Sequence, residues 1–265
     1  YILVLDEADL MCDMGFLPDI RRILAKLPRE RQTLFFSATM PNEIRTLSND
    51  LLRNPATVQI DVATPAKTVQ HALFPVHESL KARLLSAMIK SMPDGRVLVF
   101  TRTKHRAKRL AQNLVKEGGR VAMLQGNMSQ NKRQEAMKGF QSGKYDVLVA
   151  TDIAARGIDV ADISHVINFD MPDTADTYIH RIGRTGRALQ TGDAFTFSTP
   201  SDEDTIRGIE KILKSKIERK QFPDFDYSVS AEAMQARPPQ PHRGGHGGGH
   251  SGRPARRPHH QRASR

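Results

Sequence analysis

The feature that most constrains the fold is the alternation of short apolar runs with helix-like segments between residues 69 and 216. The apolar runs are bounded by polar or turn-forming residues, as buried strands are. Strands that alternate with helices of about 10 to 15 residues imply βαβ units, in which a parallel sheet is covered by helices on both faces. The predicted fold class is therefore α/β. The predicted strands are residues 97–100, 121–124, 147–150, 165–169 and 194–198, and the predicted helices lie around 80–88, 107–114, 130–140 and 204–216.

The first 60 residues predict a smaller version of the same pattern. Strands are expected at 2–5 and 33–36, with an edge strand at 57–60. Helices are expected at 10–17, 20–27 and 41–52, the first two ending at Pro18 and Pro28, because proline disrupts a helix interior. Residues 61–68 show no helical period and are predicted to link a domain formed by residues 1–60 to a second domain formed by residues 69–216.

The remaining residues, 217–265, are predicted to form a basic, disordered tail. The net charge of the chain is +11, and its last 29 residues hold seven arginines and no acidic residue. Such a composition cannot bury enough apolar surface to fold, but it binds phosphate backbones through counterion release. A purely solubilising role is the alternative. The five histidines of the tail lack neighbouring acids or cysteines, which argues against a metal site.

No apolar run approaches the roughly 20 residues of a membrane span, so no membrane association is expected. The single cysteine, Cys12, excludes an internal disulfide and is compatible with a reducing cytosol, and a small core residue is its simplest interpretation. A cytoplasmic location is therefore expected.

Two short segments carry candidate chemistry. Asp6, Glu7 and Asp9 directly follow the first predicted strand, and carboxylates at the end of a buried strand are typical of Mg²⁺ sites in nucleotide hydrolases. The segment 180–187 contains three arginines spaced by glycines, which suits a clamp for phosphate oxygens, because the arginine side chain is a planar fork of donors that stays charged. The alternative for this segment is a solvated basic helix end.

Together with residues 37–39, these segments give the chain its resemblance to a family. The chain resembles the DEAD-box RNA helicases, and the sequence around its motifs is most similar to the bacterial RhlE type. The motifs that carry the resemblance are residues 6–9, 37–39, 97–102, Gln130 with Arg133, residues 150–159, and residues 180–187. The resemblance implies two RecA-like domains, of which residues 1–60 would be the C-terminal part of the first.

The resemblance also implies a role for individual residues. Asp6 would hold Mg²⁺ through water molecules, Glu7 would orient the attacking water, and Arg184 and Arg187 would contact the γ-phosphate of ATP. Asp9, Ser37, Thr39, His180 and Arg181 would couple the two domains. Gly157 and Asp159 would bind ATP. Asp152 is expected to pair with an arginine. The RNA-binding residues would be Thr101, Arg102, Gln125, Gly126, Gln130, Arg133, Thr151 and Arg156, although Arg102 by itself could equally be a surface ion-pair partner.

The activity implied is RNA-stimulated ATP hydrolysis that unwinds short RNA duplexes, with ATP and Mg²⁺ as cofactors. RNA is the expected partner, bound with little sequence preference, and ribonucleoprotein or ribosome-assembly particles are further expected partners. The chain contains no G-x-x-x-x-G-K-[ST] phosphate loop, and this loop is expected upstream of Tyr1. A non-catalytic RNA-binding fragment therefore remains an alternative. A third alternative is a two-metal hydrolase that uses Asp6 and Asp9, but the sequence lacks the further metal ligands that such a site requires.

Overall fold

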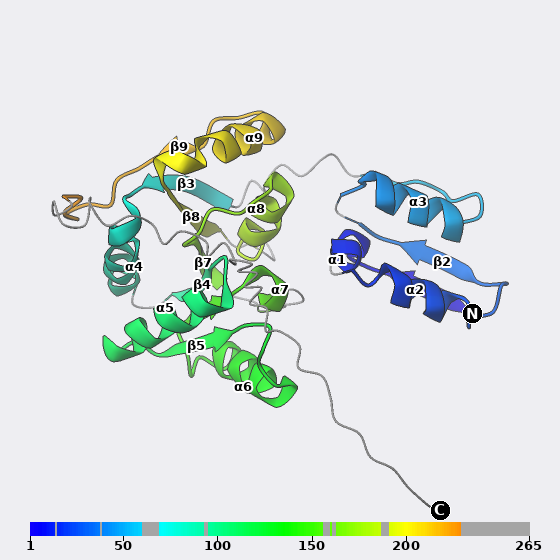
Figure 1. Ribbon diagram of the computed structural model, residues 1–265, viewed down its shortest axis with the longest axis horizontal. Helices are drawn as coiled ribbons and strands as arrows, with labels where there is room; N and C mark the ends of the chain where they lie inside the picture. Colours follow the sequence, from blue (N-terminus) through cyan, green and yellow to red (C-terminus); the bar gives the residue numbers. More distant parts are fainter. Residues whose placement is uncertain are drawn as a thin grey trace, which may run out of the picture. The chain divides into compact units, whose positions relative to one another are not determined.

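The computed structural model describes residues 1–13, 15–37, 39–59, 69–92, 95–155, 160, 163–186 and 191–228. These residues form two parallel sheets. The smaller sheet pairs β1 (Ile2–Leu5) with β2 (Gln32–Phe35), and the larger has seven strands in the order β5-β6-β4-β7-β8-β3-β9. Figure 1 shows the larger sheet with its helices. All the pairings are parallel, which confirms the predicted fold class.

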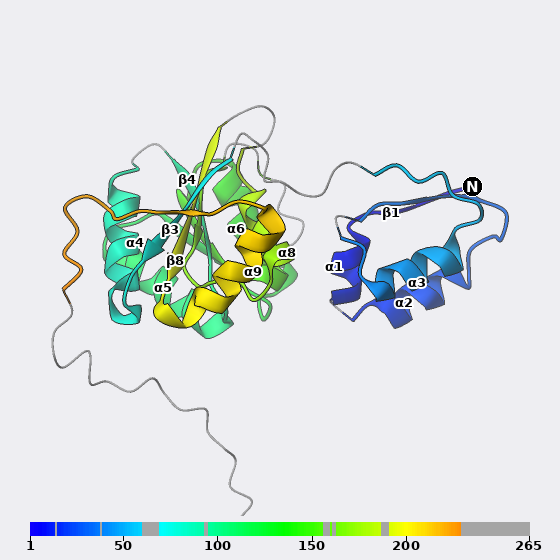
Figure 2. The ribbon, with the colours of Figure 1, turned by 90° about the horizontal axis from the view of Figure 1, so that it is seen from above.

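The larger sheet has an apolar core on each face. One core joins α6, α8 and α9 to the sheet through Phe140, Tyr178 and Ile209. The other joins α4 and α5 through Leu84 and Leu110. Figure 2 shows the same arrangement, with α4 and α5 on one side of the strands and α8 and α9 on the other. Because helices cover both faces, the central strands β4 and β6 are almost continuously apolar.

Most elements of the larger sheet lie where the sequence predicts them. The strands are β3 (Val69–Pro75), β4 (Arg96–Phe100), β5 (Val121–Leu124), β6 (Val147–Ala150), β7 (Ile163–Asn168), β8 (Gly192–Ser198) and β9 (Glu218–Arg219). The helices are α4 (Lys81–Lys90), α5 (Lys104–Lys116), α6 (Gln130–Gln141), α7 (Asp152–Ala155), α8 (Ala175–Ile182) and α9 (Glu203–Leu213), with single 3₁₀ turns at Glu78–Leu80 and Pro200–Asp202.

The sequence did not predict four of these elements, β3, β9, α7 and α8. The two strands extend the larger sheet, because β9 pairs with β3, and Ile217, next to β9, is buried. Phe222, Phe225 and Tyr227 then pack against the core on the α4 and α5 side. The ordered fold therefore extends beyond residue 216, where the second domain was predicted to end.

The smaller sheet is covered by α1 (Ala8–Asp13), α2 (Leu17–Leu24) and α3 (Asn42–Leu51). Two predictions were wrong here. Pro18 does not end a helix but lies in the first turn of α2, where its missing N–H has no intrahelical partner to lose. Residues 57–59 are not in a strand, so the predicted edge strand is absent from the described part of 57–60.

Candidate functional site

Asp6 and Glu7 lie where β1 ends, and both side chains are exposed. The carboxylate of Asp6 accepts a hydrogen bond from the Glu7 backbone N–H at 2.9 Å. Glu7 has a φ of 50°, a left-handed conformation that is unfavourable for a residue with a Cβ. Unfavourable backbone of this kind is concentrated at functional sites. The exposed carboxylate oxygens are hard ligands that suit Mg²⁺ with water molecules completing its shell.

Asp9 joins the end of β1 to the end of β2. Its Oδ2 accepts hydrogen bonds from both the backbone N–H and the hydroxyl of Thr39, each at 2.9 Å. The Asp9 backbone N–H donates to the Ser37 hydroxyl at 3.2 Å, and that hydroxyl donates to the Thr39 carbonyl at 2.6 Å. This partly buried network fixes residues 37 and 39 beside the carboxylates, at the same end of the sheet, as the sequence predicts.

Arg181 is buried at the C-terminal end of α8 and is held entirely by neighbouring elements of the larger sheet. Its Nε and Nη2 donate to the two oxygens of Asp152 at 2.6 and 2.7 Å. Its Nη1 donates to Asn168 Oδ1 at 3.2 Å and to the Asp170 carbonyl at 2.8 Å. These contacts hold α8 in place, and the expected role of Arg181 in coupling the two domains stays a prediction. The pairing of Asp152 with an arginine is confirmed.

His180 and Arg184 flank Arg181 and contact the carboxylates after β1. His180 Nε2 lies 3.9 Å from Asp9 Oδ2, and Arg184 Nη2 lies 3.8 Å from Glu7 Oε1. Both pairs lie inside the compact unit Tyr1–Val229. A cavity of about 500 Å³ is lined by Asp9, Thr39, Pro41, Phe100, Asp152, Ala155, Asp173, Thr174, Asp176, Thr177, His180, Arg181 and Arg184.

The turn that carries Arg184 is fixed by a residue that sequence reasoning missed. The buried hydroxyl of Thr185 donates to the carbonyls of Ile163 and Ser164, at the start of β7. Gly192 allows this approach, because a Cβ at that position would lie 2.0 Å from Thr185 Oγ1 and 2.6 Å from the Gly186 nitrogen. The two glycines and the small threonine in this segment are the only sequence signal for such close packing.

The predicted RNA-binding residues after β4 and β6 differ in their access to solvent. Thr101 is fully buried, with its hydroxyl directed to the carbonyls of Thr103 and Ala150, so the prediction that its side chain contacts RNA does not fit the structure. Thr151 is 9% exposed. Arg102 is exposed and lies 3.6 Å from Asp173, which matches its alternative interpretation as a surface ion-pair partner.

The remaining described candidates lie after β5 and on α6. Gly126 is exposed, and a Cβ there would meet nothing within 4 Å. Gln125 accepts a hydrogen bond from the Asn127 N–H at 2.7 Å. Gln130 is exposed at the first residue of α6, and Arg133 donates to the Ala154 carbonyl at 3.2 Å. Arg133 therefore fixes α7 and keeps further donors for a ligand. Arg156, Gly157, Asp159 and Arg187 lie outside the described residues.

Within the described ranges, no helix is long and apolar enough to cross a membrane. The same residues contain no cluster of three or more His, Cys, Asp or Glu side chains that could hold a metal ion. A two-metal centre on Asp6 and Asp9 therefore has no third ligand of these types in the described part of the chain.

A parallel α/β fold that places carboxylates after a strand beside an arginine-bearing helix end is typical of nucleotide hydrolases. Comparison with known proteins identifies the family. Residues 1–47 match the family model described as DEAD/DEAH box helicase, and residues 80–189 match the helicase conserved C-terminal domain. The chain belongs to the DEAD-box RNA helicase family, as its motifs predict.

The matched relatives include the DEAD-box ATP-dependent RNA helicase CshA of Bacillus licheniformis, which is 41% identical over 86% of this chain and 47% of its own length. The RNA helicase CrhR of Synechocystis is 45% identical over 81% of this chain and 44% of its own length. The chain thus spans about half the length of the curated relatives it matches. Similarity to the RhlE type in particular stays a prediction.

Solved structures of family members match as well. S. cerevisiae Dbp5 bound to RNA and ADP BeF3 is 31% identical, with a TM-score of 0.76 over 84% of this chain and 60% of that chain. E. coli SrmB bound to the regulator RraA is 37% identical, with a TM-score of 0.55 over 60% of this chain and 96% of that chain.

Proposed function

We propose that this chain is the part of an ATP-dependent RNA helicase that couples RNA-stimulated ATP hydrolysis to the separation of short duplexes and the remodelling of ribonucleoproteins. The observation that carries the proposal is the contact between Glu7 and Arg184, at 3.8 Å. It brings the carboxylate after β1 and a cation after α8 to one place, as phosphoryl transfer requires. The RNA-bound Dbp5 structure, which resembles this chain, supports the proposal.

The residues around the contact between Glu7 and Arg184 would each have a separate role in ATP hydrolysis. ATP would supply the transferred phosphoryl group, and Mg²⁺ would neutralise its charge. Asp6 presents exposed oxygens that would hold the metal through water, and Glu7 would orient or deprotonate the attacking water. Arg184, joined by Arg187, would stabilise the charge on the γ-phosphate, while Gly157 and Asp159 would bind the nucleotide.

A second group of residues would make hydrolysis depend on the relative position of the two sheets. Asp9 is anchored by Ser37 and Thr39 and lies 3.9 Å from His180. This contact is too long for a strong hydrogen bond, so small movements would make or break it. Residues 61–68 would act as the linker that permits such movement. Arg181 would keep α8 and therefore Arg184 in place.

RNA would bind along the carboxyl ends of β4, β5 and β6. Arg102, Gln125, Gly126, Gln130 and Arg133 lie there with accessible donors or an open backbone, and Thr151 and Arg156 would complete the surface. Donors of these types contact phosphates and sugars without reading bases, so little sequence preference is expected. The 2′-hydroxyl would distinguish RNA from DNA. A cytoplasmic location and ribosome-assembly particles as substrates belong to the same proposal.

The proposal is tested with Arg184→Ala and Glu7→Gln in the full-length protein, by steady-state ATP hydrolysis with and without RNA. Each variant should lose hydrolysis by orders of magnitude, because an arginine that contacts the γ-phosphate contributes about 10³ to 10⁵ in rate. RNA binding without nucleotide should persist. Arg207→Ala, which removes an exposed cation of α9 paired with Asp204 at 3.7 Å, is the matched control and should behave as wild type. Turnover within about threefold of wild type in the Arg184 or Glu7 variant would contradict the assigned roles.

A further inference from the structure

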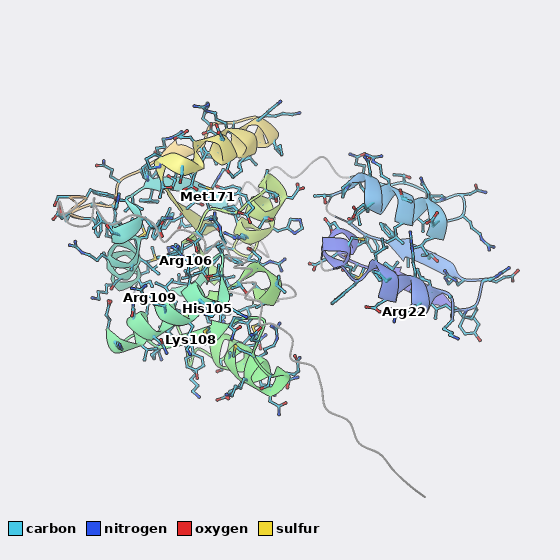
Figure 3. All side chains as sticks on the ribbon, in the orientation of Figure 1. Arg22, His105, Arg106, Lys108, Arg109 and Met171 are labelled. Carbon is cyan, nitrogen blue, oxygen red and sulfur yellow. The ribbon has the colours of Figure 1, made fainter. Side chains whose placement is uncertain are left out.

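Beyond the predicted RNA-binding residues, α5 carries a group of basic residues without a structural role. Lys104, His105, Lys108 and Arg109 are all exposed, and we call them the α5 basic face. Within the described part of the chain, their side chains make no ion pair or hydrogen bond. Figure 3 shows His105, Lys108 and Arg109 together on this helix, with Arg106 nearby.

The positions of these residues place them on one side of the helix. Residues 104 and 108, and residues 105 and 109, are each spaced i, i+4, so the members of each pair lie about one turn apart on the same side of the helix, and from residue 104 to residue 109 the helix rises about 7.5 Å. The opposite side is apolar and packs on the sheet through Ala107, Leu110, Ala111 and Leu114. The α5 basic face therefore points away from the core as a short row of positive charge.

Helix stability does not explain this charge. The first turn of α5 contains basic residues and no acid, and the helix dipole disfavours cations at that end. Lys104 and Lys108 are also spaced i, i+4, where like charges repel. Arg106 differs from them, because it pairs with Asp170 at 2.9 Å and with Glu78. The acidic residues Asp170 and Glu78 therefore form ion pairs with Arg106, which is not part of the α5 basic face.

We infer that the α5 basic face binds RNA phosphates and extends the RNA path beyond the carboxyl edge of the larger sheet. The face starts at Lys104, two residues after Arg102 and four residues after the end of β4, and so it follows the proposed RNA-binding residue Arg102 closely along the chain. Unpaired exposed cations suit this task, because each phosphate that they neutralise releases counterions. The inference deepens the proposed function and rests on its RNA path.

The test compares the chain with its triple variant Lys104→Gln, Lys108→Gln, Arg109→Gln. Glutamine has nearly the helix propensity of lysine and arginine, so α5 should still fold, which circular dichroism checks. Affinity for unstructured RNA is measured between 0.1 and 1 M salt. The slope of log K against log salt should become shallower by about 2, since each single-strand phosphate contact contributes about 0.7. With equal affinity at 1 M salt, this slope change predicts affinity reduced by about 100-fold at 0.1 M.

The matched control removes three charges from scattered exposed positions, by Lys26→Gln, Lys116→Gln and Lys211→Gln. Its salt slope should stay within error of wild type. Equal slopes for the two triple variants would overturn the inference, and so would an equal loss of affinity for long RNA and for an oligonucleotide that covers only the carboxyl edge. Failure of the full-length protein to hydrolyse ATP, with the slope still reduced in the α5 variant, would contradict the proposed function and leave this inference standing.

Discussion

Asp152→Ala should destabilise the larger sheet's domain severely, although Asp152, the first residue of α7, is only partly buried. The substitution removes two hydrogen bonds, at 2.6 and 2.7 Å, from Arg181, whose side chain is 3% exposed. Removal of one partner from a buried ion pair costs about 3 to 5 kcal/mol, because the other charge is left buried and uncompensated. Arg181 keeps Asn168 and the Asp170 carbonyl as acceptors, so the lower limit of about 3 kcal/mol applies here.

For a domain of this size, 1 kcal/mol corresponds to about 2 to 4 °C in Tm, so Asp152→Ala should lower the Tm by about 6 to 12 °C. Thermal denaturation of the chain, followed by circular dichroism, measures this shift. Asp146→Ala is the matched control, because it breaks an equally short pair with Arg120 that is exposed. Solvent screens such pairs, so the control should change the Tm far less. Equal Tm shifts for the two variants would refute the argument that burial of Arg181 makes its pair important.

Three further predictions concern packing, pH and the tail. Gly192→Ala should lower the free energy of unfolding measured in urea, because the new Cβ would clash with Thr185. Gly208→Ala, in an open position within α9, should instead raise it by about 0.5 to 1 kcal/mol. A stabilising Gly192→Ala with a destabilising Gly208→Ala would contradict the close packing at Gly192. Burial lowers the pKa of His71 below 6.5, so protonation favours the unfolded state and stability should fall as the pH drops below 6.5; a His71→Gln variant with the same pH dependence would show that His71 is not responsible. Deletion of residues 237–265 should weaken binding to unrelated RNAs equally and reduce the salt dependence of the affinity. A loss of affinity for one RNA alone would instead show that the tail binds RNA sequence-specifically.

The sequence predicted the centre of the larger sheet well, because residues 97–100 of β4 and all of β6 are apolar and α5 has a clear helical period. It missed β3, whose sequence Val-Gln-His-Ala-Leu-Phe-Pro includes polar residues and ends in proline, both of which are unfavourable signals for a strand. It also missed β9, which has two residues and depends on its pairing with β3 rather than on local propensity. Long-range pairing of this kind leaves no local pattern to read.

The sequence predicted which residues form the site better than it predicted which contacts these residues make. The proximity of Asp9 and Thr39 followed from the rule that parallel strands deliver their carboxyl ends to one edge of a sheet, and the structure confirms it. The burial of Arg181 and Thr101 could not be predicted, because arginine and threonine are usually exposed, and only the tertiary partners of these two residues compensate their polar groups.

The nucleotide and RNA sites are proposed to act together across Glu7 and Arg184, and the affinity for RNA in the presence of ADP BeF3 measures this coupling. Coupling between two sites changes the affinity of one ligand when the other binds, typically by about 5- to 150-fold. The full-length protein should therefore bind RNA more tightly with ADP BeF3 than with ADP, and Arg184→Ala should abolish the difference. An RNA affinity that is identical with the two nucleotides in the wild-type protein would contradict the account.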